Sequence, residues 1–193
     1  MDHRALIAVV IVIAVVAIAA IVLVVSRKRR SEALKQRFGP EYERAVLTRG
    51  DAAKAEKELI DREKRVHSFT IKPLSPTARE RFREEWTQIQ NRFVDDPAVA
   101  VKQADSLVNR VMAERGYPMA DFEQRAADVS VSYPVVVQNY RAACAIVQRH
   151  AAGQAGTEDL RQAMVHYRSL FEELLDLPKA TTTSRGYLHE RAS

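Results

Sequence analysis

The chain has 193 residues, of which 47% are hydrophobic, and a formal net charge of +5. This hydrophobic content supports a packed core, and the only cysteine, Cys144, excludes an intramolecular disulfide framework and a four-cysteine zinc site. Residues 1–30 hold five basic residues and one acidic residue, whereas the other 163 residues hold 25 basic and 24 acidic residues. Most of the excess positive charge therefore lies in one short segment. Because a nucleic-acid-binding domain spreads a basic face over its folded surface, we expect no nucleic-acid partner.

Behind a short N-terminus of residues 1–4, residues 5–25 form an unbroken apolar run of eight Val, five Ile, two Leu and six Ala. As a helix this run is about 32 Å long, close to the ~30 Å thickness of a bilayer's hydrocarbon core. A cleaved signal peptide is the alternative, but its apolar region is usually ~7–15 residues long and a small-residue cleavage site follows it. Basic residues follow here instead, so we expect an uncleaved transmembrane helix.

Four cations, which we call the basic cluster, follow the apolar run: Arg27, Lys28, Arg29 and Arg30. The other flank offers only Arg4, which Asp2 offsets. Since the more basic flank stays inside, these four residues predict an outside N-terminus and a cytoplasmic location for residues 26–193. The same cations can attract anionic lipid headgroups.

Residues 26–68 are expected to form a basic flank and a charged helical stalk. Gly39 and Pro40 should break the first helix, a short helix should cover residues 41–48, and Asp51 should cap a third helix over residues 52–67. The third helix is rich in Ala, Lys and Glu and has a thin apolar side, which predicts a solvated helix or one that lies on a domain surface.

Residues 69–177 are expected to form a compact all-α domain of about five helices, because apolar residues recur every three or four positions in five segments. Ser75, Asp96, Asp121 and Thr157 are the expected N-caps, and Pro134 should open the fourth helix. Residues 129–133 alternate between apolar and polar, but no second strand is evident, so we expect a connector. Residues 178–193 lack an apolar period and predict a disordered tail. The apolar stripes are Ala78, Phe82, Trp86, Ile89 and Phe93; Val101, Ala104, Val108 and Val111; Phe122, Ala126 and Val129; Val136, Tyr140, Ala143, Cys144, Val147 and Ala151; and Leu160, Ala163, Met164, Tyr167, Phe171 and Leu174.

The sequence carries no signature of enzymatic chemistry. No histidine has another three to five residues away, and the patterns HExxH, GxSxG, GxGxxG and Walker A are absent. Cys144 falls on an apolar stripe, which predicts a buried, inert thiol. We therefore expect no catalytic residue, no metal and no cofactor, and the sequence leans against an enzyme.

Five motifs resemble those of a bacterial family of N-terminally anchored helical proteins. They are RFGPEY at residues 37–42, RFVDDP at 92–97, ERGYP at 114–118, DFEQRA at 121–126 and DLRQAMVHYR at 159–168. The resemblance covers about residues 5–175 and implies an anchor followed by a helical C-terminal domain. It implies no activity and supplies no catalytic residues.

Together these features favour a single-pass protein of the cell membrane, with the lipid bilayer and a protein of unspecified identity as partners. The helical domain would serve as a protein-interaction or scaffold module at the cytoplasmic face. One alternative is a membrane-bound enzyme or small-ligand binder with a pocket between helices, for which His166, Arg125 and Tyr167 are the candidate residues. Another is a lipid-surface or envelope-stress module that acts through the basic cluster.

Overall fold

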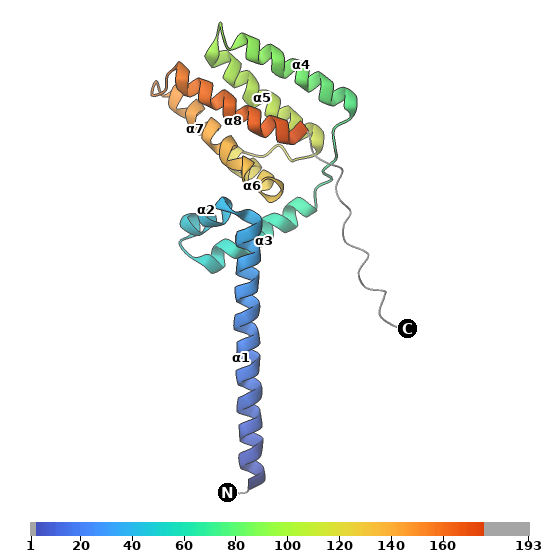
Figure 1. Ribbon diagram of the computed structural model, residues 1–193, viewed down its shortest axis with the longest axis vertical. Helices are drawn as coiled ribbons and strands as arrows, with labels where there is room; N and C mark the ends of the chain where they lie inside the picture. The colour runs from blue at the N-terminus through green and yellow to red at the C-terminus, as the bar shows by residue number, and fades with distance from the viewer. Residues whose placement is uncertain (1–2, 176–193) are drawn as a thin grey trace. The chain divides into compact units, whose positions relative to one another are not determined.

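The first helix, α1 (His3–Phe38), continues without a break from the apolar run through the basic cluster (Figure 1). The computed structural model describes residues 3–175, and side chains from residue 11 onward; the predicted tail lies outside the described residues. All eight elements in the described part are α-helices, which confirms the all-α prediction. The chain divides into two compact units, residues 1–61 and 62–193.

One helix of the first unit is long and apolar enough to cross a membrane. Within α1, the qualifying segment is Ile11–Phe38, with a mean hydropathy of 2.5 in its most apolar window. None of that window is buried in the protein. The core helix of a water-soluble domain buries its apolar face, so this exposure distinguishes α1 from such a helix.

The charged helices of the first unit pack more closely than their sequence suggests. Here the end of α1 packs with α2 (Pro40–Arg49) and the first turns of α3 (Ala52–His67). The Tyr42 hydroxyl donates a 2.9 Å hydrogen bond to Glu56 Oε1 and lies 3.3 Å from Ser31 Oγ. Phe38 and Leu59 are fully buried. The predicted break at Gly39 and the three helices are confirmed.

The second unit begins in the last turns of α3 and contains five further helices. They are α4 (Pro76–Arg92), α5 (Pro97–Arg115), α6 (Phe122–Ser132), α7 (Val136–Ala151) and α8 (Thr157–Leu175). Helix α5 packs against α4 and α8, α8 packs against α7, and α6 packs against α7 (Figure 1). The number of helices in this domain is as predicted.

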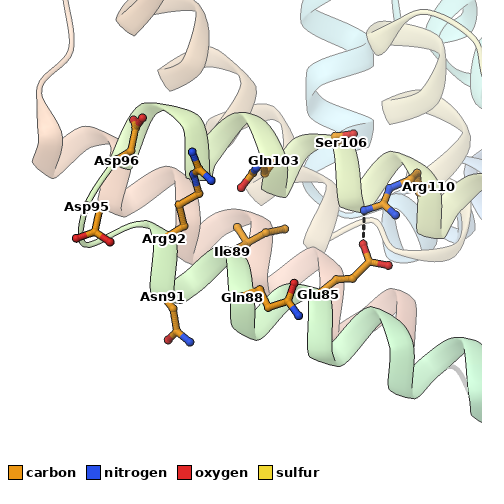
Figure 2. A pocket seen from close by; sticks show the side chains of 10 residues that line it. All are labelled: Glu85, Gln88, Ile89, Asn91, Arg92, Asp95, Asp96, Gln103, Ser106 and Arg110. Carbon is orange, nitrogen blue, oxygen red and sulfur yellow. Dashed lines mark hydrogen bonds and ion pairs between the residues drawn. The ribbon is translucent and has the colours of Figure 1, made fainter.

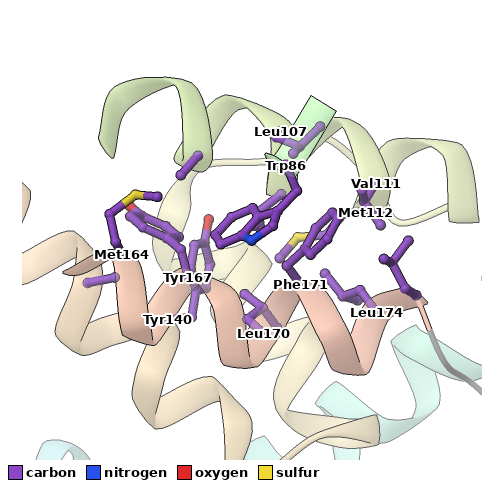
Figure 3. Close-up of a cluster of buried hydrophobic side chains, with 14 of the residues drawn as sticks. Trp86, Leu107, Val111, Met112, Tyr140, Met164, Tyr167, Leu170, Phe171 and Leu174 are labelled. Atoms are coloured by element: carbon purple, nitrogen blue, oxygen red, sulfur yellow. The ribbon is translucent and has the colours of Figure 1, made fainter. Parts of the chain in front are cut away.

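The predicted aromatic stripe of α4 lies in the core of the second unit (Figure 3). Trp86 stacks on Phe171 of α8, with ring centroids 4.8 Å apart and an interplanar angle of 17°. Leu107 and Val111 of α5 are fully buried in the same cluster. These contacts confirm that the stripe is core and give α4, α5 and α8 one shared apolar interface.

Three of the predicted caps of this unit are confirmed. Ser75 Oγ accepts a hydrogen bond of 3.1 Å from the Ala78 amide, and Asp96 and Asp121 cap α5 and α6 in the same way. At α8 the prediction is wrong, because Thr157 is the first helical residue and the cap position falls on Gly156. Asp159 Oδ2 accepts a hydrogen bond of 2.9 Å from the Gly156 amide. The side chain that pairs with the amide at the cap position therefore comes from inside the helix. Helix α7 begins at Val136, two residues after Pro134.

Residues 129–132 are the last turn of α6, not a connector, which corrects the prediction for this segment. The helix is buried on two sides, so apolar and polar residues can alternate along it as they would in a strand. Val129 and Val131 are buried, and Ser130, also buried, accepts a 2.9 Å hydrogen bond from Arg62 Nη1 of α3. Of the two polar positions, Ser130 therefore binds an arginine inside the protein, whereas Ser132 is exposed.

Candidate functional site

A chain of hydrogen bonds, the core network, connects four helices inside the second unit. Arg125 Nε of α6 donates to the Tyr140 hydroxyl of α7 at 3.3 Å, and that hydroxyl donates to Asn109 Oδ1 of α5 at 3.2 Å. Asn109 Nδ2 donates to Asp105 Oδ2 at 3.1 Å. The Tyr167 hydroxyl of α8 donates to Asp105 Oδ1 at 3.0 Å. Each of these side chains therefore has a partner on another element or one helical turn away.

Burial keeps both hydroxyl groups of the core network protonated. Tyr140 and Tyr167 are fully buried. Loss of solvent raises the pKa of Tyr140 to about 12, against an opposing effect of the hydrogen bond from Arg125. Burial also raises the pKa of Tyr167, and the nearby Cys144 and Asp105 add to that rise. Both groups therefore act as hydrogen-bond donors at neutral pH.

Cys144 lies at the edge of the core network. Its Sγ is 3.5 Å from the Tyr167 hydroxyl oxygen, and the residue is half-buried, whereas the sequence predicted a buried thiol. Burial raises the pKa of the thiol to about 11. Because the thiolate is the reactive form, this environment disfavours a nucleophilic role.

The three candidate pocket residues occupy two separate places. Arg125 and Tyr167 belong to the core network, and Arg125 also donates to the carbonyl of Ala120. His166 Nδ1 instead lies 3.0 Å from Asn139 Oδ1, and the amide of Asn139 donates to Ser169 Oγ at 2.9 Å. The polar groups of the three candidates are thus engaged with the protein itself, and the structure does not bring them together around a shared cavity.

A second polar feature is a groove of about 720 Å³ between α4 and α5, which we call the α4–α5 groove (Figure 2). Its floor includes Ile89, which is buried in the core. The remaining lining is polar: Glu85, Gln88, Asn91, Arg92, Asp95, Asp96, Gln103, Ser106 and Arg110. The sequence predicts Asp96 as an N-cap and Ile89 as a core residue, but it does not predict the groove, because no periodic signal marks a groove between two helices.

Only three of these polar side chains are engaged within the protein. Glu85 and Arg110 form an ion pair of 2.5 Å across the groove, and Asp96 caps α5. For the other six, no hydrogen bond or ion pair of the side chain is found within residues 3–175: Gln88, Asn91, Arg92, Asp95, Gln103 and Ser106. The groove therefore presents amide donors and acceptors, a hydroxyl, a cation and an anion on two packed helices and the turn between them.

The chemistry of the α4–α5 groove suits recognition of a polar chain. Two glutamines and an asparagine can each donate to and accept from a peptide backbone, and Arg92 can pair with a carboxylate. Histidine and cysteine are absent from the lining, and no group of three or more His, Cys, Asp or Glu side chains within the described residues could hold a metal ion. The groove thus offers the hydrogen-bond donors and acceptors of a polar binding surface.

The four residues of the basic cluster, which the sequence predicts to set the membrane topology, lie on α1. All four side chains of the basic cluster are exposed. No ion pair involving them occurs in the described part of the chain, whereas Lys35, one turn further on, lies 3.5 Å from Glu32 Oε1. Among the described side chains, the four cations of the basic cluster therefore have no ion-pair partner.

Comparison of the chain with protein-family models, with curated proteins and with solved structures gives no match. The resemblance of the five motifs to a bacterial family accordingly stays a prediction.

Proposed function

We propose that this protein is a single-pass membrane protein whose helical domain binds another protein through the α4–α5 groove at the cytoplasmic face. The observation that carries the proposal is the set of six unengaged polar side chains that line a groove between two packed helices. Residues 5–25 are the proposed anchor, with the N-terminus outside.

The anchor is supported by length, exposure and flanking charge. The apolar run matches the thickness of a bilayer's hydrocarbon core, and the part of α1 within the described side chains exposes its apolar residues. An exposed apolar helix of this length is unfavourable in water and favourable in lipid. The basic cluster at its C-terminal end supports the cytoplasmic orientation of the domain.

Protein binding is favoured over small-molecule binding by the composition of the groove. Small-molecule sites are usually concave and lined mainly by apolar and aromatic side chains. Here Ile89 is the one apolar member of a ten-residue lining. An extended peptide segment supplies backbone donors and acceptors at short intervals, which matches a row of glutamine and asparagine side chains.

Position-specific photocrosslinking in native membranes tests this proposal. A photoreactive residue at Gln103, in the groove, should give discrete protein adducts, whereas one at the exposed Gln148 of α7 should not. The substitution Arg92→Glu should abolish the adducts at Gln103 because it reverses the unpaired charge of the groove. The matched control Lys102→Glu makes the same charge reversal at the residue next to Gln103, which does not line the groove. This control should leave the adducts intact. Identical adducts at both positions, or no effect of Arg92→Glu, would contradict the proposal.

A further inference from the structure

We propose that the basic cluster binds anionic phospholipid headgroups in the leaflet that surrounds the C-terminal end of the membrane helix. This inference rests on the proposed membrane insertion and adds a lipid specificity to it. Three observations carry it: the continuity of α1, the position of the four cations along that helix, and the absence of a neutralising partner within the described residues.

The continuity of α1 fixes the depth of the cations. The helix has no break between the apolar run and Phe38, so each residue past Val25 advances about 1.5 Å along one axis. Arg27 to Arg30 therefore lie roughly 3–8 Å beyond the end of the apolar run. The headgroup region of a leaflet is about 5–8 Å thick, so the backbone of all four residues falls within it.

The spacing of the cations surrounds the helix with charge. Successive residues of an α-helix are rotated by about 100°, so four consecutive cations occupy roughly 300° of the circumference. No single protein surface can contact all four at once. Lipid headgroups pack on every side of a membrane helix and can do so.

The charge of the cluster selects the kind of lipid. Arg27, Lys28, Arg29 and Arg30 are exposed and without ion-pair partners in the described residues. Zwitterionic headgroups have no net charge with which to neutralise them, whereas phosphatidylglycerol and similar lipids each supply one negative charge. Basic residues near an anionic membrane surface typically gain about fivefold in affinity each.

Lipid retention by the full-length protein tests the proposal. The protein is placed in nanodiscs that contain equal amounts of phosphatidylcholine and phosphatidylglycerol, and native mass spectrometry counts the lipids retained on release. We expect an excess of phosphatidylglycerol of at least about fivefold. The variant R27Q/K28Q/R29Q/R30Q should retain the two lipids about equally. The control K54Q/K57Q/K72Q/K102Q removes the same net charge from exposed lysines elsewhere and should keep the excess.

Several outcomes would overturn the proposal. Equal retention of both lipids by the unmodified protein, or a persistent excess in the variant lacking the basic cluster, would do so while leaving membrane insertion intact. Displacement of the lipid excess by inorganic phosphate, but not by chloride at equal ionic strength, would show that the cations take free phosphate instead. Failure of the full-length protein to enter nanodiscs of either lipid would overturn this inference together with the proposed anchor.

Discussion

Tyr167 of α8 and Asp105 of α5 lie 62 positions apart in the sequence and are joined by a hydrogen bond of 3.0 Å within the core network. Asp105 is half-buried, so its carboxylate oxygen is only partly rehydrated when it loses this donor, and rotating or sliding α8 against α5 therefore carries a cost. This pair therefore sets the register between two helices whose apolar contacts alone would tolerate alternatives.

Replacement of Tyr167 by Phe tests this role. The substitution keeps the ring and removes the hydroxyl that donates to Asp105, so the free energy of unfolding should fall by about 0.5–1.5 kcal/mol. Trp86, the single tryptophan of the chain, lies in the core of the second unit and reports its unfolding by fluorescence. Urea titration of the full-length protein in mild detergent provides the measurement. Tyr42→Phe, which removes a hydroxyl from the first unit, should leave the Trp86 transition unchanged.

Gly116 closes α5 in a conformation that alanine tolerates poorly. Its φ is +96°, and an added Cβ would clash with the carbonyl oxygen of Thr70. Gly153 also has a positive φ, +71°, but open space around the position of its Cβ. Gly153→Ala should therefore lower the free energy of unfolding by about 1–2 kcal/mol, because it introduces backbone strain only. Gly116→Ala should lower it by more, because it adds the clash with Thr70. Equal losses of stability in the two variants would show that the contact with Thr70 does not constrain this turn.

The Cys144 thiol should react slowly in the folded protein. Burial raises its pKa to about 11 from an ordinary value of 9.0, so the folded state holds little thiolate at neutral pH. Alkylation should be much faster in denaturant. Since the folded pKa is the higher one, the contribution of this group to stability is complete below pH 9 and is lost as the pH rises through about 11. Similar alkylation rates in native buffer and denaturant would contradict this placement.

The second unit should fold without the membrane helix, provided that the end of α3 is retained. Arg65 donates to the buried carboxylate of Asp128, with Nη2 2.6 Å from Oδ1, and Arg62 donates to Ser130. A fragment of residues 62–193 should give a strongly helical circular dichroism spectrum. A fragment that begins at residue 69 lacks both arginines and should be less stable by at least about 1.5 kcal/mol. A spectrum dominated by strand or coil would refute the architecture.

The sequence predicted most helix ends correctly because their signals are local. The side chains of Ser75, Asp96 and Asp121 accept hydrogen bonds from amides three residues further along the chain. Gly116 ends α5 because its backbone adopts the left-handed conformation. The segment after Val129 was predicted wrongly because Ser130 is buried and binds Arg62 of α3, a contact that no local pattern reveals.

The candidate sites were harder to predict than the helices. Asp105 and Asn109 stand four residues apart beside the apolar stripe of α5, and that spacing was an available signal of a polar pair facing another helix. The α4–α5 groove combines Arg92 with Gln103 from the neighbouring helix, so it exists only once the two helices have packed. Its lining could not be derived from either segment alone.

The orientation of the protein in the membrane of a bacterial expression host tests the central claim most directly. With a reporter fused after Ser193, we expect the uncleaved protein to stay in the membrane on alkaline extraction and its reporter to lie in the cytoplasm. Replacement of the basic cluster by glutamine should weaken the orientation bias without releasing the protein, since the apolar run supplies most of the insertion energy. A soluble product that lacks the first thirty residues and carries its reporter outside the cytoplasm would contradict the account.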